Sequence, residues 1–390
     1  MNVMPDEPFE LPPDLLRAVP LFAELSKVLS WTGGPVNWDL ARQVAVAVAG
    51  SEERVHSVDA ADATAIAEAV RLAELWLAES PGLPQPSRMA SVSALTPARW
   101  AERATVLREI VDPLAAKVAA ALSDQSGQIA DAQAGMMGPV MEQMAPVFMG
   151  IQAGVALGSL ATSVLGTYDV PVPLAEEGTL DIVVPTVDSI AETFGLDRDS
   201  TRLWVALHQT AHRIVFEAMP GVSAHFFALF HNYVSAMQID LTGVFDRLAS
   251  LDITSPENLR EAMEQEGFFG IADSPAADAA MVRVQRLLAM IEAFADRAVD
   301  AASTRLPNAA RIAEAMSRRR AEPAGGEKMF GQFLGLTIPP DFVRDADTFC
   351  RGVLNAADWT ALARMWDDSE NLPTDTELTE PAVWLARVSG

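Results

Sequence analysis

Two histidines spaced four residues apart are the side chains in this sequence that could most readily bind a metal ion. His208 and His212 lie in the segment Asp199–Met219. Apolar residues recur through this segment at helical spacing, at Trp204, Val205, Leu207, Ala211, Val215 and Phe216. Residues i and i+4 of a helix stack on one side, so the two imidazoles would project together. A pair of neutral imidazoles placed in this way is a common ligand set for a divalent zinc ion.

The residue after the first histidine decides what such a metal could do. In the hydrolytic motif His-Glu-x-x-His, the glutamate takes a proton from the metal-bound water. Residues 208–212 read His-Gln-Thr-Ala-His here, so Gln209 stands at the glutamate position. An amide cannot accept and return a proton near pH 7, and positioned acid–base help is worth about 10²–10⁴ in rate. The alternative for the pair is two histidines packed on a buried face and bonded to carbonyls or carboxylates.

Three residues are candidates for a third metal ligand. His225 and His231 follow close downstream, although the pattern with a third histidine six residues past the second fails because Ala218 stands there. Glu292 is the only charged residue in the apolar run 287–295 of a long predicted helix. A buried carboxylate is costly unless it is paired, hydrogen-bonded or bound to a metal. On the residues alone, metal binding by Glu292 and pairing with an arginine stand as equal alternatives.

The composition argues against several classes of function. With 28 basic and 53 acidic residues, the 390-residue chain has a net charge of −25, which argues against a nucleic-acid or anionic-membrane surface. The short basic run 318–320 is expected to be a solvated helix end. The single cysteine, Cys350, allows no intramolecular disulfide and is expected to be a small buried hydrophobe. Because the acidic, proline-rich first residues lack the features of a signal peptide, a cytoplasmic location is expected.

The spacing of apolar residues predicts a mainly α protein with little β structure. Besides the histidine helix, helices are expected at Asp14–Ser30, Asn37–Ala49, Asp59–Glu79, Thr96–Leu122, Val187–Phe194 and Asp345–Leu354, and one strand at Thr179–Val184. We divide the chain into a flexible lead-in at residues 1–13, an N-terminal helical subdomain at 14–86, and a helical body at 87–390 that carries the candidate metal ligands. The proline-rich stretch 81–86 marks the boundary.

The segment Gln143–Tyr168 contains no charged residue and is long enough to span a bilayer. Gly150, Gly154 and Gly158 repeat every four residues within it, which is the small-residue spacing of closely packed helices. The segment also contains several polar residues and has no flanking lysine or arginine. We therefore expect a central buried helix whose glycines let another helix approach closely, and no membrane span.

Several stretches, in order along most of the chain, resemble those of a known family. They comprise residues 34–41, 164–169, 204–208, 318–320 and 330–336, and a closing region around Trp366, 372–374, 377–378 and 384–385. The family is that of the zincin-like metallopeptidases, found mostly in actinobacteria and labelled as hydrolases or zinc-dependent metalloproteases. The resemblance implies a zincin-like helical fold and a zinc-dependent hydrolase site.

The second motif of that family reads roughly Glu-Gly-His-Ala-Asp, and residues 292–296 read Glu-Ala-Phe-Ala-Asp here. The resemblance therefore implies that Glu292 is the third zinc ligand. It also makes Asp296 and Asp300 candidates for orienting an imidazole from outside the ligand set.

Three positions depart from the family pattern, and all three bear on the chemistry or the close packing at the metal. Gln209 replaces the basic glutamate, Ala293 replaces a glycine and Phe294 replaces a histidine. The other motifs persist beside these losses, as expected of a site under relaxed catalytic demand. Phe294 in particular cannot donate a hydrogen bond to a developing oxyanion.

Three functional interpretations follow from these residues. In the first, the protein binds zinc but performs little or no proteolysis, and acts by binding a peptide or protein partner. In the second, it is an active metallohydrolase in which another acid, such as Glu217 or Asp296, relays the proton. In the third, it is a metal-free helical binding or scaffold protein.

Overall fold

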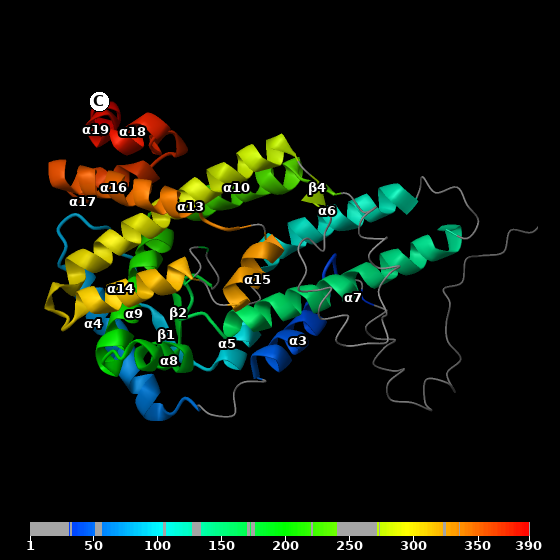
Figure 1. Cartoon of the computed structure of the whole chain (residues 1–390), viewed down its shortest axis with the longest axis horizontal. Helices are drawn as coiled ribbons and strands as arrows, with labels where there is room; N and C mark the ends of the chain where they lie inside the picture. Colours follow the sequence, from blue (N-terminus) through cyan, green and yellow to red (C-terminus); the bar gives the residue numbers. More distant parts are fainter. Residues whose placement is uncertain are drawn as a thin grey trace, which may run out of the picture.

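Helices make up most of the described part of the molecule, which confirms the mainly α fold class (Figure 1). The computed structural model describes residues 31, 33–50, 57–103, 107–126, 134–169, 172, 176–219, 221–239, 271–272, 274–322, 325–334 and 336–389. The predicted lead-in at residues 1–13 and the helix predicted at Asp14–Ser30 lie outside these ranges. The boundary placed at residue 86 stays a prediction.

Long helices alternate with a few short strands along the chain. The first half contains α3 (Trp38–Gly50), α4 (Ala60–Ala78), β1 (Ser91–Leu95), α5 (Pro97–Arg103), α6 (Arg108–Ser126), α7 (Ala134–Ala161), β2 (Thr179–Val183), α8 (Val184–Phe194), α9 (Arg198–Ala218) and α10 (Val222–Ala236). The second half contains β3 (Gln238–Ile239), β4 (Ile271–Ala272), α13 (Pro275–Ala302), η2 (Ser303–Arg305), α14 (Ala309–Ala321), α15 (Gly325–Leu334), α16 (Pro340–Ala356), α17 (Trp359–Ala363), η3 (Arg364–Trp366), η4 (Ser369–Asn371), α18 (Asp375–Thr379) and α19 (Pro381–Ser389).

Several helix boundaries follow directly from capping residues. Asn37 accepts a hydrogen bond from the backbone N–H of Leu40 at the start of α3, and Asp59 forms a capping box with Asp62 at the start of α4. The cap of α9 is Asp197, whose side chain accepts from the N–H of Ser200. The long helix predicted at Thr96–Leu122 is two helices, α5 and α6.

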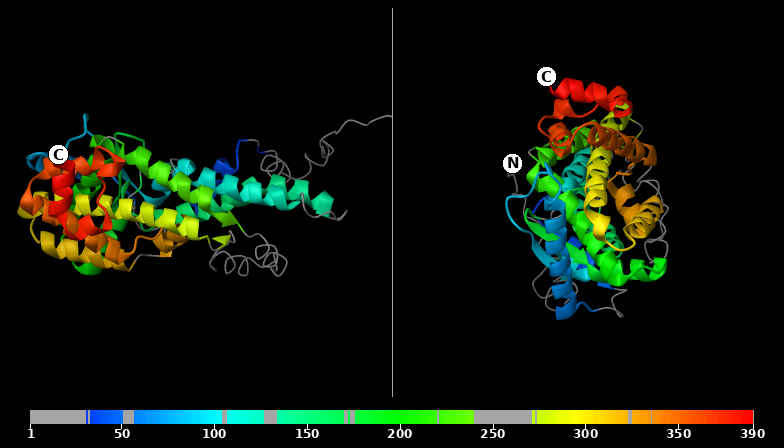
Figure 2. Two further views of the ribbon diagram at one scale, coloured as in Figure 1. Left: turned by 90° about the horizontal axis from the view of Figure 1, so that it is seen from above. Right: turned by 90° about the vertical axis from the view of Figure 1, so that its left-hand side faces the viewer.

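The apolar segment ending α7 packs closely against α3. A Cβ added at Gly150 would lie 2.6 Å from the carbonyl oxygen of Asn37, and one at Gly154 would lie 2.6 Å from that of Ala41. Only glycine permits this approach, so the prediction of a buried helix with a close neighbour is confirmed. Figure 2 shows α6 and α7 extending together away from the compact body. Among the described residues no single helix is long and apolar enough to cross a membrane. The helices α9 and α10, which meet at a bend of 85°, reach the required length and apolar composition only when they are taken together.

A small sheet flanks the histidine helix. β1 and β2 pair in parallel, from Ser91 with Thr179 to Leu95 with Val183. On its other side, β2 is bordered by an antiparallel segment, in which the N–H of Thr167 donates to the carbonyl of Asp181 and the carbonyl of Leu165 accepts from Val183. The strand predicted at Thr179–Val184 is confirmed as β2, which ends one residue earlier, whereas β1 was not predicted.

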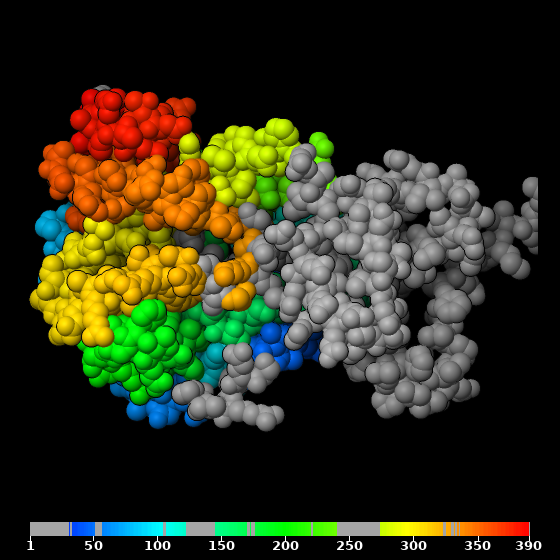
Figure 3. Space-filling view, viewed as in Figure 1, coloured from blue at the N-terminus to red at the C-terminus, as the bar shows by residue number. Residues whose placement is uncertain are grey.

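The helix α9 lies at the centre of the body and packs against α4, α8 and α13. Its first turns are anchored by Arg202, which pairs with Asp188 of α8 at 2.7 Å and with Asp62 of α4 at 2.8 Å. On the face seen in Figure 3, α14 lies at the surface between α8 and α16. These helices hold α9 and α13 side by side, and that arrangement brings the candidate metal ligands together.

Candidate metal centre

His208 and His212 stack on one face of α9, as their spacing predicts. Their ring centroids lie 4.4 Å apart with the two rings tilted by 48°, and the ring of His208 stacks on that of Trp204. Both side chains are buried. Burial lowers the pKa of His208 well below its ordinary value and lowers that of His212 to about 4. Both imidazoles are therefore neutral near pH 7, which is the form that binds a metal ion.

Glu292 reaches both histidines from the neighbouring helix α13. Its Oε1 lies 3.4 Å from Nε2 of His208, and its Oε2 lies 3.0 Å from Nε2 of His212. One ligand atom from each of these three residues falls within 4.8 Å of the others, in a fully buried cluster. Of the three candidates for a third ligand, the structure brings only Glu292 to the histidine pair.

The donor set fits a metal ion, because the tautomer of His212 is fixed. Its Nδ1 lies 3.0 Å from the carbonyl oxygen of His208, which can only accept, so Nδ1 carries the proton. The lone pair of Nε2 then faces the carboxylate of Glu292, which is also an acceptor. A cation between these atoms would turn that unfavourable contact into two coordination bonds. Two imidazole nitrogens with one carboxylate are a common zinc ligand set.

Gln209 is fully buried and is bonded to the segment beside β2. Its side-chain oxygen accepts a hydrogen bond from the backbone N–H of Tyr168 at 2.6 Å, which fixes the orientation of the amide. The approach needs glycine at residue 166, where an added Cβ would lie 2.9 Å from this same oxygen and 2.4 Å from the carbonyl oxygen of Asp181. The stretch 164–169 therefore ties the sheet to the metal-binding helix.

The other end of the Gln209 amide is a buried donor. Its Nε2 has no hydrogen-bond partner among the described residues, and neither does Nδ1 of His208 on the same helix. Buried polar atoms are nearly always bonded to protein or to water. One of these atoms belongs to a candidate ligand and the other to the residue that follows it in α9, so both are available to a polar group bound beside this helix.

Arg320 of α14 also contacts Glu292. Its guanidinium touches Oε1 of Glu292 and also makes two bonds to Asp296, at 3.0 and 3.2 Å. Asp296 thus holds Arg320, and no contact of Asp296 with an imidazole occurs among the described residues. The Arg320 side chain is 34% exposed, whereas that of Glu292 is buried.

Arg319 is mostly buried, so the expectation of a solvated helix end is wrong for this residue. It pairs with Asp169 at 2.7 Å and donates to the carbonyl of Ser163, also at 2.7 Å. Arg318 fits the expectation, since it is exposed and pairs with Glu314 of its own helix. Arg320 is exposed as well, but it is paired with Glu292 and Asp296. Neighbouring arginines therefore fasten the 163–169 segment and α13.

The remaining candidate residues lie in other settings. His231 is exposed and contacts the carbonyl of Phe227 in its own helix. Glu217 pairs with Arg213 at 2.9 Å and accepts from the N–H of Gly178. Asp300 is half exposed and pairs with Arg297. None of them belongs to the His-His-Glu cluster.

Phe294 points into an aromatic cluster. Its ring meets those of Trp359 and Trp366 edge to face, with centroids 5.2 and 6.2 Å away. Residues two positions apart in a helix differ by a rotation of about 200°, so Phe294 lies across α13 from Glu292. The interpretation of Phe294 as a lost partner of the transition state is therefore wrong, because its side chain faces α17 and η3.

A mainly helical body with two histidines of one helix and a glutamate of a second helix beside it defines a candidate metal centre of the zincin type. The sequence matches the family model described as "Zincin-like metallopeptidase" over residues 36–385, and the chain belongs to that family. The fold is similar to a crystal structure from Chloroflexus aurantiacus described as "a putative hydrolase with a novel fold". The TM-score is 0.62 at 22% identity, covering 91% of this chain and 99% of that one, which shows a shared fold. Among curated proteins, none matches the chain.

Proposed function

We propose that this protein is a zinc-binding member of its family that performs little or no proteolysis and acts by binding a peptide or protein partner. The observation that carries the proposal is the contrast between two parts of one helix. His208 and His212 meet Glu292 in a buried cluster, while the adjacent Gln209 replaces the residue that would move a proton.

The residues His208, His212 and Glu292 would hold the metal. Bound there, zinc would supply a Lewis acid that polarises a carbonyl and lowers the pKa of a bound water. The protein contributes neutral imidazoles and a buried carboxylate, but the amide of Gln209 neither takes up nor releases a proton near pH 7. Without acid–base help the rate falls by about 10²–10⁴. Metal affinity depends on the three donors and is retained.

The alternative, an active hydrolase with another proton relay, has weaker support. Glu217 is held by Arg213 and a backbone N–H on a different side of α9. Asp296 lies one turn from Glu292, and burial raises the pKa of its carboxyl to about 7, a value suited to a relay. However, both of its oxygens are engaged by Arg320, whose charge favours the ionised form.

Cobalt substitution tests the metal site directly, since Co²⁺ reports its own ligand geometry in the visible spectrum. Chelator-treated protein titrated with Co²⁺ should develop visible absorption that saturates at equimolar metal and disappears when zinc is added. The variant His212→Gln should lose this signal. The matched control is His231→Gln, which changes an exposed histidine bonded within its own helix and should leave the signal intact. Absence of any absorption change in the unaltered protein would contradict the proposal.

A further inference from the structure

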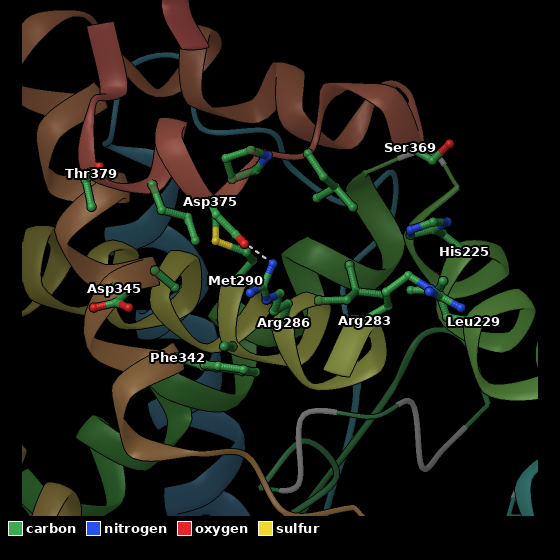
Figure 4. A pocket seen from close by; sticks show the side chains of 16 residues that line it. His225, Leu229, Arg283, Arg286, Met290, Phe342, Asp345, Ser369, Asp375 and Thr379 are labelled. Carbon is green, nitrogen blue, oxygen red and sulfur yellow. Dashed lines mark hydrogen bonds and ion pairs between the residues drawn. The ribbon is translucent and has the colours of Figure 1, made fainter. Parts of the chain in front are cut away.

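A cavity lies against α13, on a face of this helix that differs from the face carrying Glu292. It has a volume of about 380 Å³, within the range of small-molecule sites. The residues Arg283, Arg286, Leu287 and Met290 face it, following the i, i+3, i+4, i+7 stripe of the helix. The helices α10, α16 and α18 complete the walls (Figure 4). None of the three candidate metal ligands lines it, so its function can be tested independently of zinc.

The walls combine apolar surface with one ion pair. The apolar side chains are those of Leu229, Leu287, Met290, Phe342, Leu372 and Leu378. Arg286 is neutralised by an ion pair with Asp375, and its guanidinium also lies 5.4 Å from the ring centre of Phe342. Arg286 is therefore committed to holding α16 and α18 against α13.

Arg283 is the other arginine that lines the cavity. No ion pair or hydrogen bond of its side chain occurs among the described residues, although the chain carries 53 acidic against 28 basic residues. In Figure 4 its side chain extends toward α10, on the same side of the Arg286–Asp375 pair as His225. A guanidinium and an imidazole at one end of an apolar cavity form a site for a carboxylate.

The opposite end of the cavity offers hydrogen-bond acceptors. Asp345 and Thr379 lie there, across the ion pair from Arg283 (Figure 4). Asp345 is half exposed beside Arg344, and the Thr379 hydroxyl donates to the carbonyl of Thr376, so the oxygens of both residues can still accept. The N–H groups of a peptide would donate to these oxygens, whereas a hydrocarbon chain would not. The charge pattern therefore distinguishes a peptide from a fatty acid.

We propose that this cavity binds the C-terminal end of a short peptide whose last side chain is apolar. The terminal carboxylate pairs with Arg283 beside His225, the apolar side chain packs against Leu287 and Met290, and the amide N–H groups donate toward Asp345 and Thr379.

Calorimetric titration with acetyl-Ala-Leu tests the proposal. The free acid should bind, and the same peptide with an amidated C-terminus should bind at least about tenfold more weakly, because it loses a charge-assisted hydrogen bond. Arg283→Gln should lower the affinity of the acid by a similar factor and leave that of the amide unchanged. This variant is not expected to disturb folding, because Arg283 is exposed and has no partner among the described residues.

The matched control is Arg318→Gln, an exposed arginine away from the cavity, which should bind the acid as the unaltered protein does. Decanoate serves as the second ligand and should bind more weakly than the peptide acid. The proposal is overturned if no peptide acid binds, if acid and amide bind equally, or if decanoate binds more tightly than the peptide.

Discussion

The side-chain oxygen of Gln209 accepts the backbone N–H of Tyr168 at 2.6 Å, so the residue at the catalytic-base position is part of a structural link. A glutamate could accept the same hydrogen bond with one of its carboxylate oxygens. Its other oxygen would take the place of Nε2, which has no partner among the described residues. The substitution Gln209→Glu therefore changes the chemistry while keeping the shape and the link.

We predict that Gln209→Glu gains zinc-dependent hydrolysis of a general peptide substrate, by up to about 10²–10⁴ over the unaltered protein. The gain should be abolished by a chelator. The matched control is Gln152→Glu, which places the same change at another buried amide, on α7, and should gain nothing. Fluorogenic peptide cleavage measures both. Strong chelator-sensitive turnover by the unaltered protein would show that Gln209 does not limit activity.

The position of Phe294 determines whether adding Phe294→His to Gln209→Glu should increase the activity further. A histidine there would be buried against Trp359 and Trp366 and would not face Glu292. Phe294→His should therefore lower the free energy of unfolding without adding to the activity of Gln209→Glu. A double variant with higher turnover than the single one would contradict the placement of this side chain.

We predict that Arg320 competes with a metal ion for Glu292, because its guanidinium contacts Oε1 of this carboxylate. Replacing it in Arg320→Met leaves the Glu292 carboxylate without its cation, and the metal-free protein should lose about 1–3 kcal/mol of unfolding free energy. Zinc affinity should rise by at least about tenfold, because a like charge is removed from the metal site. Denaturant unfolding and competition with a chromophoric chelator measure the two effects.

The control for this prediction is Arg318→Met, which removes an exposed arginine of the same helix and should change neither quantity. A fall in zinc affinity in Arg320→Met would mean that Arg320 orients Glu292 and does not compete with the metal.

Gly166 is predicted to be essential for the contact between α9 and the sheet. In Gly166→Ala the added Cβ would meet the carbonyl oxygen of Asp181 at 2.4 Å, and overpacking of this kind costs about 1–3 kcal/mol. Gly325→Ala adds a methyl group where nothing lies within 4 Å and should be close to neutral. Unfolding midpoints in denaturant compare the two. Equal stability of both variants would show that the 164–169 segment can shift to accommodate the added methyl group.

The helix α18, which forms part of the cavity wall, should contribute less to the stability of the fold in acid. Hydrogen bonds from Arg387 lower the pKa of Glu377 on α18 to about 2. A carboxyl whose pKa is lower in the folded state stabilises the fold above its unfolded pKa, and this stabilisation is lost as pH falls from about 4.5 toward 2. The stability difference between the unaltered protein and Arg387→Gln should shrink over this window. A difference that is independent of pH would contradict the assignment.

The sequence was informative where spacing within one helix decides the geometry. The i, i+4 spacing of His208 and His212 predicts their stacking whatever surrounds them. The isolation of Glu292 in an apolar run marked it as a buried acid that needs a partner. The pairing with an arginine is confirmed by the contact with Arg320, and Glu292 also lies beside both histidines, as metal binding would require.

The features that were missed depend on contacts across long stretches of chain. Tyr168 and Gln209 are 41 residues apart, and Arg320 and Glu292 are 28 apart. No pattern within a short stretch of sequence predicts such pairs, because they form only when whole helices pack against one another. For the same reason the basic run 318–320 was interpreted as a surface feature. Its hydrophilic composition is typical of a helix end, and the burial of Arg319 comes from the loop it holds.

The metal content of the protein, purified without a histidine tag and measured by elemental analysis, tests the metal site most directly. We predict about one zinc per chain in the unaltered protein, as a three-residue donor set holds one ion. Zinc should be absent from His208→Gln and His212→Gln, and retained in His231→Gln. Protein that contains no zinc and takes up none when the metal is added would contradict the central claim that His208, His212 and Glu292 form a metal site.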